Sequence, residues 1–83
     1  MNEYKTSNQK VATYCVYAGL VLMTVELVGE KSLMFTLYDP DGIGPQLDRD
    51  FYSGATITSP KELLEVADEI RGEVRRMYRA NNL

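Results

Sequence analysis

The sequence predicts an α+β domain in which a small antiparallel sheet of three to four strands is covered on one face by one C-terminal helix. Three observations favour this class. An amphipathic stretch fills positions 59–81, two stretches within 21–37 alternate in hydrophobicity, and a run of turn-forming residues follows them. The 83 residues suffice for one domain with one modest core, spanning positions 1–83.

The predicted helix begins with clear signals. Ser59 is a good N-cap, Pro60 suits the first helical position, and Glu62 completes a capping box. Apolar residues then recur at spacings of four and three, which is the period of an amphipathic helix: Leu63, Ala67, Ile70, Val74 and Met77. Asn81 and Asn82 are plausible stops.

The charges of this helix fall on two separate flanks. At about 100° per residue, one flank carries Glu62, Glu65, Glu69 and Glu73, and the other carries Arg71, Arg75 and Arg79. Like charges four residues apart destabilise a helix by about 0.2–0.5 kcal/mol per pair. Two interpretations stay open: a solvated helix whose charges pair elsewhere, or a basic flank that forms one edge of a binding surface.

Residues 1–9 are polar and are expected to fray, and residues 10–58 are expected to form the sheet. The first strand is predicted over 11–17, because Val, Tyr, Thr and Cys favour strands, with a turn at Ala18-Gly19. Apolar residues of the second strand share one face at Val21, Met23, Val25 and Leu27, and those of the third at Leu33, Phe35 and Leu37.

The register of these two strands follows from their turn. A loop over Gly29–Lys31 places Leu27 opposite Leu33, Val25 opposite Phe35 and Met23 opposite Leu37, so that both apolar sets share one face.

The stretch 39–50 is an acidic turn loop with Asp39, Asp41, Asp48 and Asp50, and Leu47–Ser53 is predicted to form a short fourth strand. The aspartates of the stretch 39–50 resemble part of a calcium loop. However, Ile43 replaces an oxygen ligand, and strands are expected on both sides of the stretch. We therefore expect no metal site.

Bulky residues occupy both alternation sets of the predicted first strand, and Leu20 and Leu22 lie on the second face of the next strand. One helix covers only one face of a sheet, so either irregular segments cover the other face or it meets another chain. Tyr14 and Tyr17 would be anchors of such a contact, and a homodimer is expected.

Composition excludes several classes of function. There is no histidine and only one cysteine, Cys15, which excludes an intrachain disulfide, His–Cys zinc sites and Ser–His or Cys–His nucleophiles. No catalytic residue, cofactor or metal is therefore predicted. The apolar run 11–25 is too short to span a membrane and is not followed by a small-x-small cleavage site, so a cytoplasmic location is expected.

The sequence favours a non-catalytic protein–protein interaction module: an inhibitor, adaptor or regulatory subunit. By analogy of class alone, short acidic proteins of this kind are common among phage-borne inhibitors of host defence. The predicted partner-binding residues are Asp39, Asp41, Asp48, Asp50, Arg71, Arg75, Arg79, Tyr14 and Tyr17. The alternative is a nucleic-acid-associated protein that uses the arginine-rich helix end, although the net charge of −3 opposes it.

Overall fold

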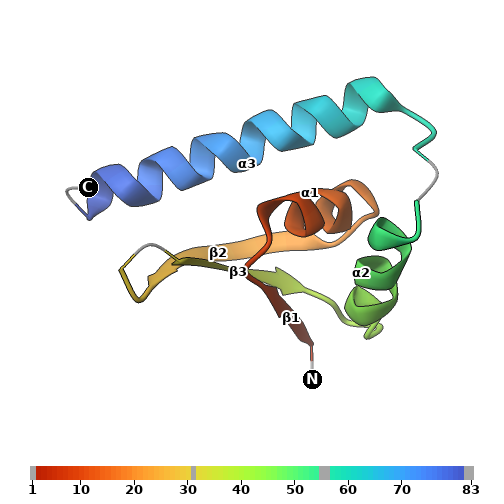
Figure 1. The fold of residues 1–83 in the computed structure, drawn as a ribbon, viewed down its shortest axis with the longest axis horizontal. Helices are drawn as coiled ribbons and strands as arrows, with labels where there is room; N and C mark the ends of the chain where they lie inside the picture. The colour runs from red at the N-terminus through yellow and green to blue at the C-terminus, as the bar shows by residue number, and fades with distance from the viewer. Residues whose placement is uncertain (1, 31, 55–56, 82–83) are drawn as a thin grey trace.

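The computed structural model describes residues 2–30, 32–54 and 57–81. Along the chain these form β1 (Glu3–Thr6), α1 (Gln9–Tyr17), β2 (Val21–Val28), β3 (Ser32–Tyr38), α2 (Gly44–Tyr52) and α3 (Pro60–Ala80). Three antiparallel strands form one sheet in the order β1-β3-β2, and α3 is the long C-terminal helix (Figure 1). The predicted α+β class is confirmed, although the order of elements differs from the prediction.

The predicted register of the β2–β3 hairpin is confirmed over most of its length. Val25 lies opposite Phe35 and Leu27 opposite Leu33. The pairing of Met23 with Leu37 is wrong, because a bulge between Leu22 and Thr24 shifts the register and Leu22 takes that place. A bulge adds one residue to one strand and so reverses which side chains face the core. Of the predicted loop Gly29–Lys31, Lys31 lies outside the described residues.

The bulge also explains the two apolar sets of β2. On the hairpin side of the bulge Val25 and Leu27 are half-buried, and on the other side Leu20 is buried and Leu22 is half-buried. Val21 and Met23 are left 59% and 49% exposed. Leu20 and Leu22 therefore lie on the core side of the sheet. Val21 and Met23, which were predicted to share the face of Val25 and Leu27, are exposed instead.

The prediction that residues 1–9 fray is wrong for positions 3–6. These residues form β1, an edge strand that pairs with β3, with Tyr4 opposite Leu37 and Thr6 opposite Phe35. The Tyr4 ring packs directly on Gly44, where a Cβ atom would clash with it. The Tyr4 hydroxyl donates a hydrogen bond to Asp48 Oδ2 at 2.5 Å. Contacts with α2, far along the chain, therefore help to order β1.

The predicted first strand is wrong, because α1 occupies this stretch. Asn8 is its N-cap, and its side chain accepts hydrogen bonds from the backbone N–H groups of Lys10 (2.9 Å) and Val11 (3.2 Å). At the other end the N–H of Leu20 bonds to the carbonyl of Cys15, and Gly19 has φ of 119°. This is a Schellman ending, which favours glycine. The bulky residues that occupied both alternation sets of the predicted first strand therefore belong to a helix, where they form an apolar stripe.

The predicted fourth strand over Leu47–Ser53 is also wrong, because this stretch lies mainly in α2. Pro45 stands in the first turn, where a missing N–H costs nothing. Leu47 and Phe51 are four residues apart and share the inner side, with Leu47 buried and Phe51 half-buried. A helix satisfies its own backbone in this short segment, so it needs no neighbouring strand.

The C-terminal helix is confirmed as α3, with Ser59 as N-cap and Asn81 as C-cap. The Ser59 hydroxyl accepts from the Glu62 N–H at 3.4 Å, which is one half of the predicted capping box. The Ser59 N–H itself donates to the Tyr17 hydroxyl at 2.9 Å. Ala55 and Thr56 of the preceding segment, and Asn82, lie outside the described residues.

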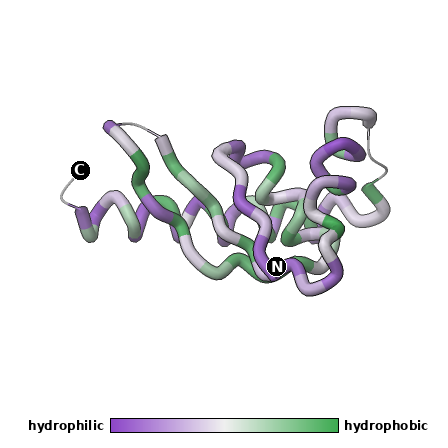
Figure 2. Tube along the Cα trace, turned by 90° about the horizontal axis from the view of Figure 1, so that it is seen from below, coloured by the Kyte–Doolittle hydropathy of each residue, from purple (hydrophilic) through white to green (hydrophobic). Residues whose placement is uncertain are grey.

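The helices α1 and α3 lie on one side of the sheet, with α1 between α3 and one end of the strands (Figure 1). Seen from below, on the side of the sheet away from α3, the described strands lie in front of α3 (Figure 2). The buried core lies between the sheet and the helices and comprises Val11, Ala12, Cys15, Leu20, Phe35, Leu37, Leu47 and Ile70.

Candidate partner-binding site

The structure separates the four aspartates of the predicted acidic surface. Asp39 is only 2% exposed, and its carboxylate accepts hydrogen bonds from the N–H groups of Ile43 (2.9 Å) and Gly44 (2.7 Å) at the start of α2. Asp48 accepts from Tyr4, and Asp50 accepts from Gln46 Nε2 at 2.7 Å. Asp41 is exposed. The predicted acidic turn loop over 39–50 is therefore wrong beyond residue 43, because Asp48 and Asp50 belong to α2, and the buried Asp39 does not offer its carboxylate to a partner.

The two predicted tyrosine anchors have different positions. The Tyr17 hydroxyl accepts from the N–H groups of Thr58 (3.1 Å) and Ser59 (2.9 Å), so it joins the end of α1 to the start of α3. A further hydrogen bond with the Thr58 side chain, together with these backbone bonds, lowers the pKa of Tyr17. Tyr14 is half-buried, with its ring 6.1 Å from that of Phe51. Of the two, Tyr14 faces a groove.

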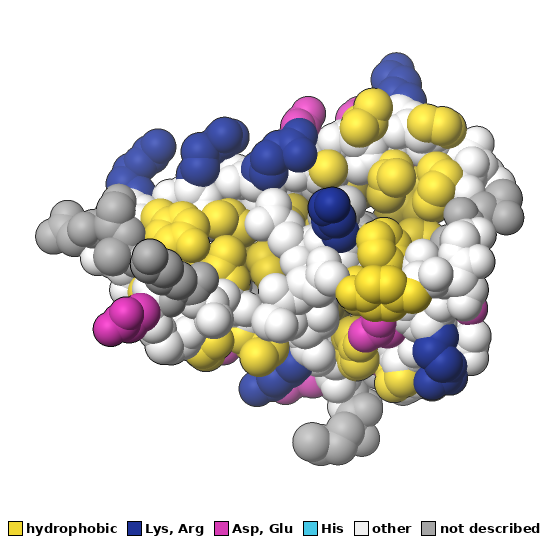
Figure 3. All heavy atoms as spheres, viewed as in Figure 1, with side chains coloured by type: hydrophobic (Ala, Val, Ile, Leu, Met, Phe, Trp, Pro, Cys, Tyr) yellow, Lys and Arg dark blue, Asp and Glu magenta, His cyan; other side chains and the backbone are white. Residues whose placement is uncertain are grey.

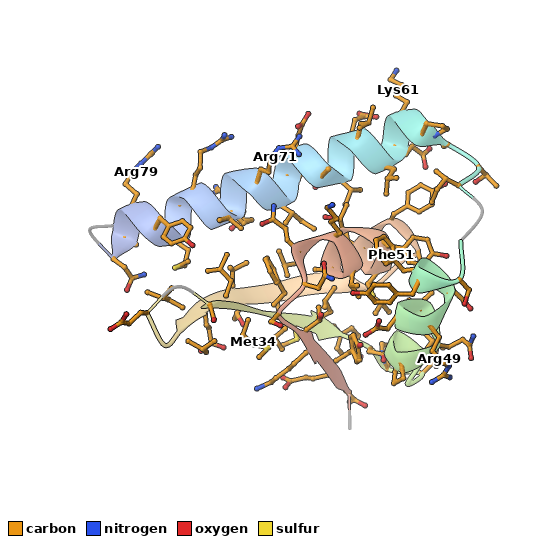
Figure 4. The ribbon with its side chains drawn as sticks, viewed as in Figure 1. Met34, Arg49, Phe51, Lys61, Arg71 and Arg79 are labelled. Carbon is orange, nitrogen blue, oxygen red and sulfur yellow. The ribbon has the colours of Figure 1, made fainter. Side chains whose placement is uncertain are left out.

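The predicted basic flank is present as an exposed row on α3. Arg71 and Arg79 point away from the sheet (Figure 4), and Arg75 is exposed between them in the sequence. Arg71 forms an ion pair with Asp68 one turn earlier, and both side chains are largely exposed. Such exposed pairs contribute little to stability. The row therefore remains available to a partner.

An apolar groove of about 580 Å³, here called the α1–α3 groove, lies beside this row. It is formed by one side of α1, the C-terminal end of α2 and the first half of α3. Its lining residues are Gln9, Lys10, Thr13, Tyr14, Phe51, Gly54, Ile57, Leu63, Leu64, Ala67 and Arg71. Hydrophobic side chains gather where these elements meet, and Lys and Arg side chains follow α3 (Figure 3).

Two features of the α1–α3 groove indicate a binding surface. Leu64 on its wall is 64% exposed, although it is a large apolar residue on a stable helix. Among the described residues, the two charged side chains that line the groove, Lys10 and Arg71, are both cations. An apolar surface with a positively charged rim has the form of a site for an amphipathic ligand with negative charges.

Of the predicted site residues, Tyr14 and Arg71 line this groove, whereas Lys10, Phe51, Ile57 and Leu64 were missed by the sequence analysis. One signal for Leu64 was present. It follows Leu63 directly, so it lies well outside the apolar stripe of the helix. Lys10 and Phe51 were missed because strands were predicted where α1 and α2 lie. With that prediction, nothing indicated that the two residues line the same groove.

A second groove of about 410 Å³, here called the β2–α3 groove, lies on the other flank of α3. Its walls are β2 and the acidic side of the helix. Its lining residues are Val16, Leu20, Val21, Leu22, Met23, Thr24, Val25, Glu69, Ile70 and Glu73. The two grooves thus have rims of opposite charge.

Cys15 is buried, and burial, with smaller effects from Asp48 and Asp39, raises its pKa to about 11. A protonated thiol in the core is a poor nucleophile. In residues 2–30, 32–54 and 57–81, no group of three His, Cys, Asp or Glu side chains is placed to hold a metal ion.

Within the same part of the chain, no helix combines the length and the apolarity needed to cross a membrane. Comparison of the chain with protein-family models, with curated proteins and with solved structures finds no match. The two grooves are therefore the features of the molecule that bear on its function.

Proposed function

We propose that this protein is a non-catalytic interaction module that binds an acidic amphipathic helix of another protein in the α1–α3 groove. The observation that carries the proposal is an apolar groove whose charged lining residues, Lys10 and Arg71, are both cations. The module would act as an inhibitor, adaptor or regulatory subunit. The single free cysteine, Cys15, agrees with a cytoplasmic location, which is part of the same proposal.

The dimensions of the groove suit a helix. The α3 residues that line it run from Leu63 to Arg71, which corresponds to about 12 Å along a helix axis. That length accommodates about two turns of a second helix, whose apolar residues three and four positions apart would lie against Leu64, Ala67 and Phe51. Acidic residues beside them would face Lys10 and Arg71, which would favour fast association and correct orientation.

Arg75 and Arg79 extend the positive charge beyond the groove along α3. A longer acidic helix could contact this row with its polar side. The same row supports the alternative that the surface binds nucleic acid, but the exposed apolar Leu64 contributes nothing to phosphate binding. Salt dependence separates the two, because binding through several phosphates weakens steeply with salt.

The test is a selection of helix-forming random peptides displayed on phage against the purified protein. We expect the enriched sequences to be amphipathic and acidic, and to lose at least about tenfold in affinity for the variant Leu64→Glu, since a charge there opposes both the apolar contact and the acidic ligand. Leu64 is exposed, so the variant should fold normally.

Arg71→Glu and Arg76→Glu provide a matched pair for the charge. Both arginines are on α3, both are exposed, and each forms an ion pair with an acid three residues earlier. Only Arg71 lines the groove. Weakened binding by Arg71→Glu alone supports the proposal. Selected peptides that are basic, or that bind Leu64→Glu as well as the unchanged protein, would refute it.

A further inference from the structure

The outer edge of β2 is the second unusual feature of the fold. In the sheet order β1-β3-β2, β2 has a neighbour on one side only within the described residues. Proteins commonly keep edge strands short, or place Lys or Pro in them, to prevent pairing with other chains. The opposite edge, β1, follows this rule with four residues and Lys5. By contrast β2 has eight residues, without Lys or Pro.

The bulge at Met23 protects only one end of this edge. From Thr24 to Val28 the strand pairs regularly with β3. Its free side therefore presents backbone N–H and C=O groups at regular intervals, as a further strand would require. A strand of eight residues spans about 27 Å.

The β2–α3 groove lies beside one end of this edge, since its lining from β2 is Val21–Val25, which includes the bulged end and the first two residues of the regular stretch. Leu22, Val25 and Ile70 supply apolar surface in it, and the exposed Val21 and Met23 stand at the bulged end. A strand added beside β2 would place every second side chain on the helix side of the sheet. The side chains that lie beside Thr24, Val25 and the bulged end would enter the groove and find apolar partners there.

The charges around the edge are negative on both faces of the sheet. Glu69 and Glu73 line the groove from α3, and Glu26 is exposed on β2 itself. Glu73 forms an ion pair with Arg76, whereas among the described residues no ion pair engages Glu69. An incoming segment with Lys or Arg among its apolar residues is complementary to this arrangement.

We propose that the edge of β2 binds an extended, basic and apolar segment of a partner protein as a fourth strand of the sheet. The backbone of Thr24–Val28 would supply the hydrogen bonds, the β2–α3 groove would accept apolar side chains, and Glu69 would pair with a Lys or Arg. This site is independent of the α1–α3 groove, so the protein would join two different ligands on opposite flanks of α3.

A second copy of this chain is a less suitable occupant. Antiparallel pairing of two β2 edges would bring Glu26, Glu69 and Glu73 of one copy towards the same residues of the other, and like charges at such a contact are unfavourable. The homodimer was predicted from apolar residues on a second face of the sheet. Those of the supposed first strand belong to α1 instead. Self-association therefore stays a prediction, and here it is an outcome of the test.

The test compares two synthetic peptides of about eight residues, a length typical of strands, whose groove-facing alternate positions carry valines and one central lysine, with threonine at the other positions; the second peptide has glutamate in place of the lysine. Nuclear magnetic resonance of the full chain follows the backbone amides during titration. We expect the lysine peptide to shift the amides of Thr24–Val28 and to slow their hydrogen exchange. The glutamate peptide should bind at least about tenfold more weakly.

Glu69→Lys and Glu65→Lys form the matched variants. Both residues are exposed on the same flank of α3, but only Glu69 lines the groove. We expect Glu69→Lys alone to weaken binding, and Leu64→Glu to leave it unchanged. Unperturbed β2 amides, equal affinity for both peptides, or no effect of Glu69→Lys would overturn the proposal. So would a dimer of the unliganded protein in light scattering, if its β2 amides are the protected ones.

Discussion

Asp39 joins the end of β3 to the start of α2 through its two carboxylate oxygens. Each oxygen accepts one backbone N–H, from Ile43 and from Gly44, and the side chain is buried. The first N–H groups of a helix have no partner within the helix, so a carboxylate there satisfies them and suits the helix dipole. A residue that resembled part of a charged surface in the sequence is thus a structural cap.

Replacing Asp39 should therefore affect stability more than binding. We expect Asp39→Ala to lower the free energy of unfolding by about 1–3 kcal/mol, because the buried N–H of Gly44 and the partly buried N–H of Ile43 lose their acceptor. Asp41→Ala, in the same loop but exposed, should change it by less than about 0.5 kcal/mol. Urea denaturation followed by circular dichroism measures both. Equal effects of the two variants would contradict this role of Asp39.

Cys15 connects burial to the pH dependence of stability. Its pKa is raised from 9.0 to about 11, so above pH 9 the unfolded chain loses the thiol proton while the folded chain keeps it. The resulting stabilisation is complete below pH 9 and is lost as the pH rises to about 11. Tyr4 acts in the same direction at higher pH, since burial, followed by its hydrogen bond to Asp48, raises its pKa.

We therefore expect the free energy of unfolding to fall between pH 9 and pH 11, and to fall less steeply in Cys15→Ala. The two denaturation series should be compared as slopes, because the cavity left by the substitution lowers stability at every pH. A native thiol that reacts with a disulfide reagent at pH 8 as fast as the unfolded chain would show that Cys15 is not buried as described.

The long helix α3 attaches to the rest of the molecule along a narrow stripe. Ile70 is 2% exposed and belongs to the core, and Val66 and Val74 pack against that core on either side. Leu64 lies on the same helix but is 64% exposed. Two aliphatic side chains six residues apart thus have different roles, one in folding and the other, in our proposal, in binding.

This difference predicts opposite results for one kind of substitution. We expect Ile70→Ala to lower the free energy of unfolding by about 2–5 kcal/mol, through lost burial and a cavity. Leu64→Ala should change it by less than about 0.5 kcal/mol, because its side chain is already in water. Thermal or urea denaturation measures both. A large loss on Leu64→Ala would mean that this residue packs internally and would weaken the case for the α1–α3 groove.

Across the whole molecule, α3 divides two surfaces of opposite charge. Its basic flank borders the α1–α3 groove, and its acidic flank borders the β2–α3 groove. The segregation of charges costs a little helix stability, since like charges stand four residues apart. That cost is understandable in a helix whose two flanks recognise different ligands, which is the function that our two proposals give it.

The sequence alone determined α3 and the β2–β3 hairpin. In each case the signal is local: a Ser-Pro-x-Glu start with a period of 3.6 in one, and a period of two with a short turn in the other. It also determined the absence of histidine chemistry and the separation of charges on α3. Such features need only residues that are neighbours in the chain.

Only the tertiary structure decided α1, α2, β1 and the bulge at Met23. Five of the nine residues of α1 are β-branched or aromatic and favour strands locally, yet packing against α3 and β3 makes the segment helical. Asn8 and Gly19 mark the two ends of α1, but in the sequence each is a single residue without a second helix signal beside it. Both grooves are likewise tertiary, because their walls come from elements far apart in the chain. Burial is a property of the assembled fold, and it overrides weak local preferences.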